Sequence, residues 1–180
     1  MDARTYTELL STHRDRVFSR ALYVLRDRED AEDVTQEAFL RLWKSGEEIP
    51  DDRAGFWLAR VVHNLCIDMT RRRKVVHTHF GRPDTEAAER LPAVAADPDW
   101  LLQLDERQQQ VIDAMATLPP ETRSVMMMHY FQGMKLREIA DALGKSVSAL
   151  KVQIHRARHS LRPVLEAEGF GNTLARRQTG

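Results

Sequence analysis

The feature that most constrains the fold is the stretch 118–163, where two glycines separate three segments with helical periodicity. Gly144 follows the second segment, at a position where helices commonly end in a left-handed residue. Ser146 or Ser148 can then cap the third segment through a side-chain hydroxyl. Gly133 separates the first two segments in the same way. We therefore expect three helices here, the last two joined by a short glycine turn.

The third segment predicts an amphipathic helix with a basic outer face. Apolar residues recur every three or four positions, and no acid occurs before Glu166. A basic helix behind a glycine turn has the geometry of a helix-turn-helix, whose second helix enters the major groove of DNA. The alternative is a surface helix whose basic face is merely solvated. The apolar positions are Val147, Leu150, Ile154, Ala157 and Leu161, and the polar ones include Lys151, Gln153, His155, Arg156, Arg158, His159 and Arg162.

Charge is unevenly distributed although the totals cancel. Lys plus Arg and Asp plus Glu both number 27, so net charge says nothing about a nucleic-acid partner. Residues 60–74 carry a net charge of +4, whereas residues 83–106 carry −6. The basic 60–74 block and the basic C-terminal helix, separated by an acidic stretch, indicate two contact surfaces and a spacer.

Composition also bounds the location of the protein. Cys66 is the only cysteine among 180 residues, so no internal disulfide can form, which suits a reducing cytosol. The polar N-terminus and the lack of a long apolar run predict neither a signal peptide nor a membrane span. We expect a cytoplasmic protein that does not insert into a membrane.

The rest of the periodicity predicts an all-α protein of two small helical domains joined by a flexible linker. Helices are expected over about 4–25, 30–44, 52–72 and 100–116. Asp30 is the expected N-cap of the second helix, and Trp43 is expected to be buried there. The predicted parts are an N-terminal domain 1–75, an acidic linker 76–99, a C-terminal domain 100–168 and a disordered tail 169–180.

Two signatures in the chain resemble the extracytoplasmic-function (ECF) RNA polymerase sigma factors. Residues 30–39, Asp-Ala-Glu-Asp-Val-Thr-Gln-Glu-Ala-Phe, resemble the second conserved region, together with Trp57-Leu58 and the basic run 71–73. Leu118-Pro119-Pro120, Glu138-Ile139-Ala140, Leu143-Gly144 and His155-Arg156-Ala157-Arg158 resemble the fourth. Both occur in the family's order. The resemblance implies a transcription initiation factor without enzymatic activity or cofactor, controlled by an anti-sigma factor.

The resemblance implies three contact surfaces. Core RNA polymerase would bind Asp30, Asp33, Gln36 and Glu37; the alternative is a solvated acidic face. The −10 promoter element would meet Trp57, Arg60, Asn64, Arg71, Arg72, Arg73 and Lys74, and the loop before them, although core packing is the favoured role of Trp57. The −35 element would meet Ser148, Lys151, Gln153, His155 and Arg156, with Arg158 and Arg162 nearer the phosphates.

The sequence departs from the family pattern at several positions of the fourth region. Lys135 occupies the place of a Ser or Thr helix cap, which leaves that cap in question. Ser148-Ala149 and Val152-Gln153 replace the usual Gly-Thr and Ser-Arg. Base preference at the −35 element therefore cannot be copied from a relative, because the missing arginine removes a phosphate or guanine contact.

The length of the linker limits what the free chain can do. Fully extended, residues 76–99 reach at most about 80 Å. Two DNA surfaces about two helical turns apart lie roughly 70 Å from each other. The linker spans that distance only when stretched, so a third body must hold the domains apart. We expect the free domains to collapse together or drift, and to bind DNA weakly.

Two other classes of protein are alternatives. A dimeric helix-turn-helix repressor or activator would explain residues 118–163 but leaves the N-terminal helices without a task. An enzyme or zinc site could use His63, Cys66, His77 and His79, which lie close in sequence. Cys66 lies between apolar neighbours on a predicted helix, however, and His77 and His79 fall in the predicted linker. A buried thiol and solvated imidazoles are the favoured interpretation.

Overall fold

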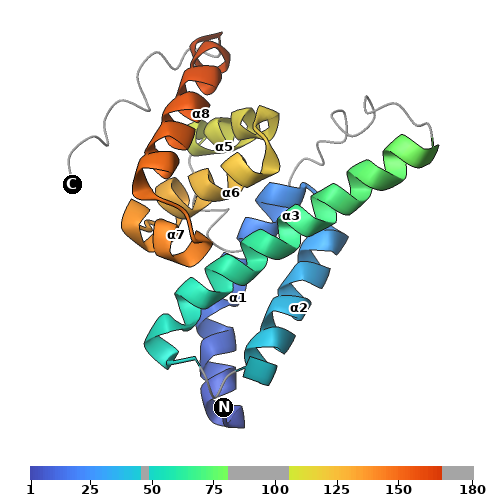
Figure 1. The fold of residues 1–180 in the computed structure, drawn as a ribbon, viewed down its shortest axis with the longest axis vertical. Helices are drawn as coiled ribbons and strands as arrows, with labels where there is room; N and C mark the ends of the chain where they lie inside the picture. The colour runs from blue at the N-terminus through green and yellow to red at the C-terminus, as the bar shows by residue number, and fades with distance from the viewer. Residues whose placement is uncertain (46–48, 81–105, 168–180) are drawn as a thin grey trace.

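A computed structural model describes residues 1–45, 49–80 and 106–167, with backbone only for 76–80, 106–108 and 167. The described part contains helices and no strand, as the sequence predicts for an all-α protein. Its buried apolar residues form two separate clusters, one in an N-terminal bundle and one in a C-terminal bundle. The two bundles lie side by side in Figure 1. No helix in these ranges is both long and apolar enough to cross a bilayer.

The N-terminal bundle consists of α1 (Ala3–Leu25), α2 (Arg28–Ser45) and α3 (Ala54–Phe80), with the short helix η1 (Asp51–Arg53) before α3. Each long helix packs against the other two. The core is formed by Leu9, Val17 and Ala21 of α1, by Val34, Ala38, Phe39 and Leu42 of α2, and by Leu58, Val62 and Cys66 of α3. Three helices thus suffice to bury one apolar stripe from each.

Two expectations for the start and end of α2 were wrong. The helix begins at Arg28, and its capping acceptor is Asp27, whose carboxylate accepts the Asp30 N–H at 3.1 Å; Asp30 lies within the first turn. Trp43 is 45% exposed rather than buried. It lies one position past the buried Leu42, outside the stripe, and its ring meets Tyr6 edge-on at 5.0 Å between centroids.

Helix α3 is longer than predicted. It continues to Phe80, whereas the loss of periodicity had suggested an end near Arg72 and a linker from residue 76. Beyond the packed part of the bundle no core selects an apolar face, so periodicity there carries no signal. The remainder of the predicted linker and the predicted tail lie outside the described residues.

The C-terminal bundle contains α5 (Glu106–Ala114), η2 (Met115–Thr117), α6 (Pro120–Met126), the π-helical segment η3 (Met127–Phe131), α7 (Leu136–Leu143) and α8 (Val147–Ala167). The three predicted helices of 118–163 are therefore present. Gly133 and Gly144 both have positive φ, 70° and 64°, as the breaks at these glycines require. The buried methionines 126–128 fill the centre of this bundle, together with Ile139, Leu150 and Leu161.

The two bundles are joined at the C-terminal end of α1. Tyr23 is 2% exposed and belongs to the core of the C-terminal bundle. Arg123 of α6 is buried, and its guanidinium donates to the carbonyls of Tyr23 and Val24 at 3.2 and 2.9 Å. It also donates to the carbonyls of Ala116 and Leu118 at 2.9 and 3.0 Å. One cation thus satisfies carbonyls at the end of α1 and in its own bundle.

A second set of polar contacts joins the bundles beside α3. His63 Nδ1 lies 2.9 Å from the Ser124 hydroxyl of α6, and both side chains are buried. The Gln132 amide bonds to the buried Arg20 guanidinium and donates to the Arg16 carbonyl at 3.0 Å. Burial lowers the pKa of both Arg20 and Arg123 to about 10, which leaves them charged at neutral pH. In this structure, the domains have collapsed onto each other.

Candidate nucleic-acid interfaces

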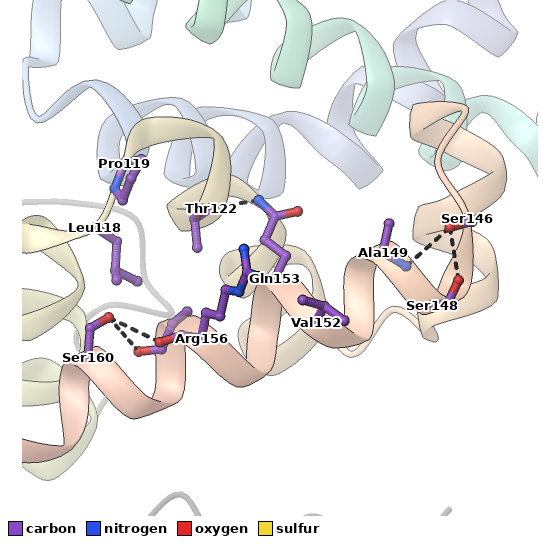
Figure 2. A pocket seen from close by; sticks show the side chains of 11 residues that line it. Leu118, Pro119, Thr122, Ser146, Ser148, Ala149, Val152, Gln153, Arg156 and Ser160 are labelled. Atoms are coloured by element: carbon purple, nitrogen blue, oxygen red, sulfur yellow. Dashed lines mark hydrogen bonds between the residues drawn. The ribbon is translucent and has the colours of Figure 1, made fainter.

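Helix α8 is held in place by its cap and by its buried stripe. The Ser146 hydroxyl accepts the Ala149 N–H at 3.1 Å, so Ser146 rather than Ser148 caps the helix. The Ser148 hydroxyl lies 3.1 Å from that of Ser146 (Figure 2). The opposite side of α8 is anchored by Leu150, Ile154, Ala157, Leu161 and Leu165, which are all buried. The remaining faces are thereby directed away from the core.

The preceding turn and helix keep half of the expected capping arrangement. Lys135 occupies the N-cap of α7, and an ammonium group offers no acceptor to the helix N–H groups. The Glu138 carboxylate, however, accepts the Lys135 backbone N–H at 2.7 Å. At the other end of α7, the left-handed Gly144 closes the helix. The helix-turn-helix is therefore intact without a hydroxyl cap on its first helix.

The outward face of α8 carries four of the predicted −35 residues. Ser148, Lys151, His155 and Arg156 are all exposed. Gln153 is turned aside, because its amide donates to the Thr122 hydroxyl of α6 at 3.0 Å (Figure 2). Of the predicted residues, these four are thus the ones that the structure brings together on one accessible face.

Of the last two predicted residues of α8, Arg158 lies at the edge of this face and Arg162 lies farther along it. Arg158 is half-buried, and Arg162 pairs with Glu166 at 2.8 Å while remaining largely exposed. A groove of about 680 Å³ runs along the other flank, between α8 and the start of α6. Its lining includes Pro119, Thr122, Gln153 and Arg156 (Figure 2). Cations on a flank suit phosphate contacts, which position a reading helix without specifying sequence.

Helix α3 exposes a second candidate surface. Arg60 and Asn64 are exposed and lie one turn apart, so they share a face. Trp57 is half-buried and packs against the N-terminal core, in agreement with the favoured packing role. Phe56 is 39% exposed and is the more accessible aromatic ring. The predicted loop before α3 includes residues 46–48, which lie outside the described residues.

The basic end of this surface is partly neutralised within the bundle. Arg71, Arg72, Arg73 and Lys74 are all exposed. Arg73 nevertheless forms an ion pair with Asp30 and lies 3.4 Å from Asp27, at the start of α2. Two residues predicted for different partners, Asp30 and Arg73, are therefore paired with each other.

The predicted polymerase-contacting residues lie on α2. Asp33 and Gln36 are exposed, and Glu37 pairs with Arg41 at 2.7 Å. Leu40 is 50% exposed one turn after Gln36, an apolar member of this face that the sequence analysis did not select. The sequence could have indicated this exposure, because Leu40 lies outside the apolar stripe of Val34, Ala38 and Leu42. Asp33, Gln36, Glu37 and Leu40 are called the α2 face below.

Val152 is a further exposed apolar residue that was not among the predicted contacts. It is 50% exposed on α8, among the predicted −35 residues. The sequence could again have indicated this exposure, because Val152 is an apolar residue outside the buried stripe, two positions after Leu150 and two before Ile154.

The described residues of the alternative metal or nucleophile site, His63 and Cys66, are buried and are not arranged as a site. Cys66 is fully buried, and burial raises the pKa of its thiol to about 12, so it is neither an accessible nucleophile nor a ready thiolate ligand. His63 bonds to Ser124 instead. Within the described residues, no three His, Cys, Asp or Glu side chains are grouped to hold a metal ion. The side chains of His77 and His79 lie outside the described residues.

Comparison with known families matches both halves of the chain. Residues 9–75 match the family model "Sigma-70 region 2", and residues 108–161 match "Sigma-70, region 4". The first contains α1 from residue 9 onward, α2 and the packed part of α3, and the second contains α7 and most of α8. The two matches thus cover the two bundles in turn.

Curated relatives match this chain along most of its length. The chain is 32% identical over 165 residues to the ECF RNA polymerase sigma factor SigE of Mycolicibacterium smegmatis, covering 89% of the chain and 62% of SigE. It is 31% identical over 175 residues to the ECF sigma factor SigL of Mycobacterium tuberculosis, covering 93% of each. It spans only 40% of another relative, the probable sigma factor RfaY of Xanthomonas campestris.

Two solved structures share the fold. The sigma factor RpoE of Bartonella quintana, in complex with the anti-sigma factor NepR, superimposes with a TM-score of 0.70 at 19% identity, over 91% of this chain and 98% of RpoE. CnrH, in complex with the cytosolic domain of CnrY, gives a TM-score of 0.64 at 23% identity, over 93% of this chain and 91% of CnrH. At these identities the likeness establishes the fold.

Proposed function

The chain belongs to the family of ECF RNA polymerase sigma factors, and from that premise we propose that it binds core RNA polymerase and directs it to specific promoters. It acts as a transcription initiation factor in the bacterial cytoplasm and performs no chemical step itself. Polymerase binds the α2 face, the −10 element meets α3, and the −35 element meets α8.

One observation carries this proposal: two exposed basic helical faces, one on each bundle, coincide with the two matched regions. Lys151, His155 and Arg156 on α8 can contact phosphates and base edges of a duplex. On α3, Asn64 can bond to the edge of an unpaired base, and Phe56 offers a ring on which a base can stack. A dimeric repressor would use only the first of these surfaces.

The contact between the bundles adds a requirement. Arg123 and His63 hold α6 against α1 and α3, so the two basic faces have a set separation in the free chain. Polymerase must replace these contacts with its own if it is to place the faces over promoter elements about 70 Å apart. Weak DNA binding by the free chain follows from this requirement.

An anti-sigma factor is the expected regulator. One structural neighbour, the sigma factor RpoE, was determined in complex with the anti-sigma factor NepR. A protein that covers the α2 face would block polymerase while leaving the folded bundles intact.

Run-off transcription with purified chain and core RNA polymerase on genomic fragments tests the proposal. We expect discrete start sites that core polymerase alone does not produce.

The double variant Asp33→Ala, Leu40→Ala should bind core polymerase with about tenfold lower affinity, because it removes a charge and an apolar contact of the α2 face. Glu32→Ala, on a different face of α2, is the matched control. Tight sequence-specific DNA binding without polymerase, and no effect on start sites, would instead support the dimeric regulator.

A further inference from the structure

Val152 occupies the centre of the outward face of α8. Successive helical residues are rotated by about 100°, which places Val152 opposite the buried stripe of Leu150, Ile154 and Ala157. The residues one turn before and after it, Ser148 and Arg156, are both exposed. Val152 is itself 50% exposed, so the most outward side chain of the reading helix has neither charge nor hydrogen-bonding group.

The chemistry of valine restricts what it can recognise there. In the major groove, adenine, guanine and cytosine offer only hydrogen-bonding groups at their edges, whereas thymine also offers the C5 methyl group. An isopropyl group therefore finds its largest apolar contact at that methyl. Its branched side chain also has one strongly preferred rotamer in a helix, so little entropy is lost when it is placed against a base.

We propose that Val152 is a specificity-determining residue of the −35 contact that selects thymine through its C5 methyl group. The inference rests on the proposed function, because it requires α8 to lie in the major groove. The surroundings support a nucleic acid rather than a protein partner. Lys151, His155 and Arg156 flank Val152, and a small apolar spot surrounded by basic and polar side chains does not provide the apolar core of a protein interface.

The neighbouring side chains provide the remaining contacts of the reading face. Ala149 is also exposed and lies one turn before Val152 on the α6 side of the face, where it extends the apolar spot (Figure 2). Gln153, whose amide bonds to Thr122, leaves this spot uncovered. Arg156 lies one turn after Val152 and can bond to a guanine or a phosphate next to the thymine. The arrangement therefore specifies one thymine with a polar contact beside it.

The test replaces thymine by deoxyuridine, which removes only the methyl group. A promoter is first selected by the wild-type holoenzyme from a library randomised over the −35 region, and each thymine there is then replaced singly on either strand. With wild-type chain, we expect one replacement to lower initiation about three- to fourfold, the effect of losing one buried methyl contact. Val152→Ala should lower initiation on the thymine template by a similar factor and be insensitive to the replacement.

Val75→Ala is the matched control, since Val75 is a similarly exposed valine (58%) on α3 and its loss should leave the thymine preference intact. Circular dichroism and binding to core RNA polymerase check that Val152→Ala remains folded and competent to form the holoenzyme. The inference is overturned if the holoenzyme initiates normally but selects no thymine, or if the wild type and Val152→Ala respond equally to every replacement. A chain that supports no initiation with core polymerase would overturn the proposed function as well.

Discussion

Helices α3 and α8 both expose basic faces, but they differ in what lies behind them. The buried stripe of α8 packs within its own bundle, so its outward face is fully formed whatever the other bundle does. Helix α3 packs in the N-terminal core and also contacts α6 and α7 of the C-terminal bundle. The face of α8 is therefore independent of domain closure, whereas α3 is coupled to it.

The chemistry behind the two helices differs in the same way. The inner side of α8 is apolar, with Leu150, Leu161 and Leu165 buried. On its side facing α6, α3 presents His63, whose burial between the bundles lowers the pKa of the imidazole from 6.5 to about 4. Apolar packing tolerates changes of pH, and a buried titratable contact does not. The bundles should thus be stable individually, and their contact should be conditional.

The largest expected effect comes from removing the contact at α1. Arg123→Met deletes four hydrogen bonds and leaves the carbonyls of Tyr23, Val24, Ala116 and Leu118 without this donor. We expect the free energy of unfolding to fall by about 3 kcal/mol and the radius of gyration to rise. Denaturant titration and small-angle scattering measure the two quantities.

The control for this variant is Arg4→Met, because Arg4 pairs only with Glu8 on an exposed surface of α1. Surface pairs of this kind contribute about 0–1 kcal/mol. If Arg123→Met were no less stable and no less compact than Arg4→Met, the bundles would not be held by this cation. Helix α3 would then not differ from α8 in being coupled to the contact between the bundles.

A smaller effect should separate the two faces. Arg156→Ala removes an exposed guanidinium on α8 and should reduce initiation at promoters that depend on a −35 element by about 5- to 150-fold, equivalent to roughly 1–3 kcal/mol. The radius of gyration and the unfolding free energy should not change, because the side chain has no described partner in the other bundle. In vitro transcription with and without the −35 sequence measures the effect. A loss of equal size on both templates would show that Arg156 does not act on the −35 element.

The smallest effect concerns pH and the α3 contact. Burial is the main cause that lowers the pKa of His63 from 6.5 to about 4, aided by the positive charges of Lys145 and Arg20 and opposed by Glu121. Between pH 6.5 and 4, His63 therefore binds a proton when the bundles are separated or unfolded but not when they are in contact. The arrangement with the bundles in contact consequently loses stability as the pH falls. At pH 5.5 the loss relative to pH 7.5 should be about 1.4 kcal/mol.

The contribution of His63 is isolated by comparing the wild type with His63→Gln. His13 is partly buried, and burial lowers its pKa as well, so it contributes in the same direction in both proteins. The pKa of Glu121 is lowered by its hydrogen bond with Lys145, and Glu121 affects stability only at more acidic pH. If the stability of the two proteins depended equally on pH between 7.5 and 5.5, a group other than His63 would be responsible for the pH dependence.

Local sequence determined the helices, the glycine turn and the two cores. Helical periodicity and glycine conformations depend on neighbours within a few residues, which explains why Gly144 and the stripe of α8 were predicted well. The same logic failed at Trp43, since one position of rotation separates a buried from an exposed ring. It also failed for the end of α3, where no core imposes a periodic pattern.

The tertiary structure decided which polar residues remain available to a partner. Nothing in the spacing of Arg123, His63 or Arg73 distinguishes them from other polar residues, yet the first two join the bundles and the third pairs with Asp30. Their partners lie between about 40 and 100 residues away in sequence, beyond the reach of any local pattern. The amino-acid order thus specified two bundles and their basic helices, whereas long-range packing determined which of their charges are exposed.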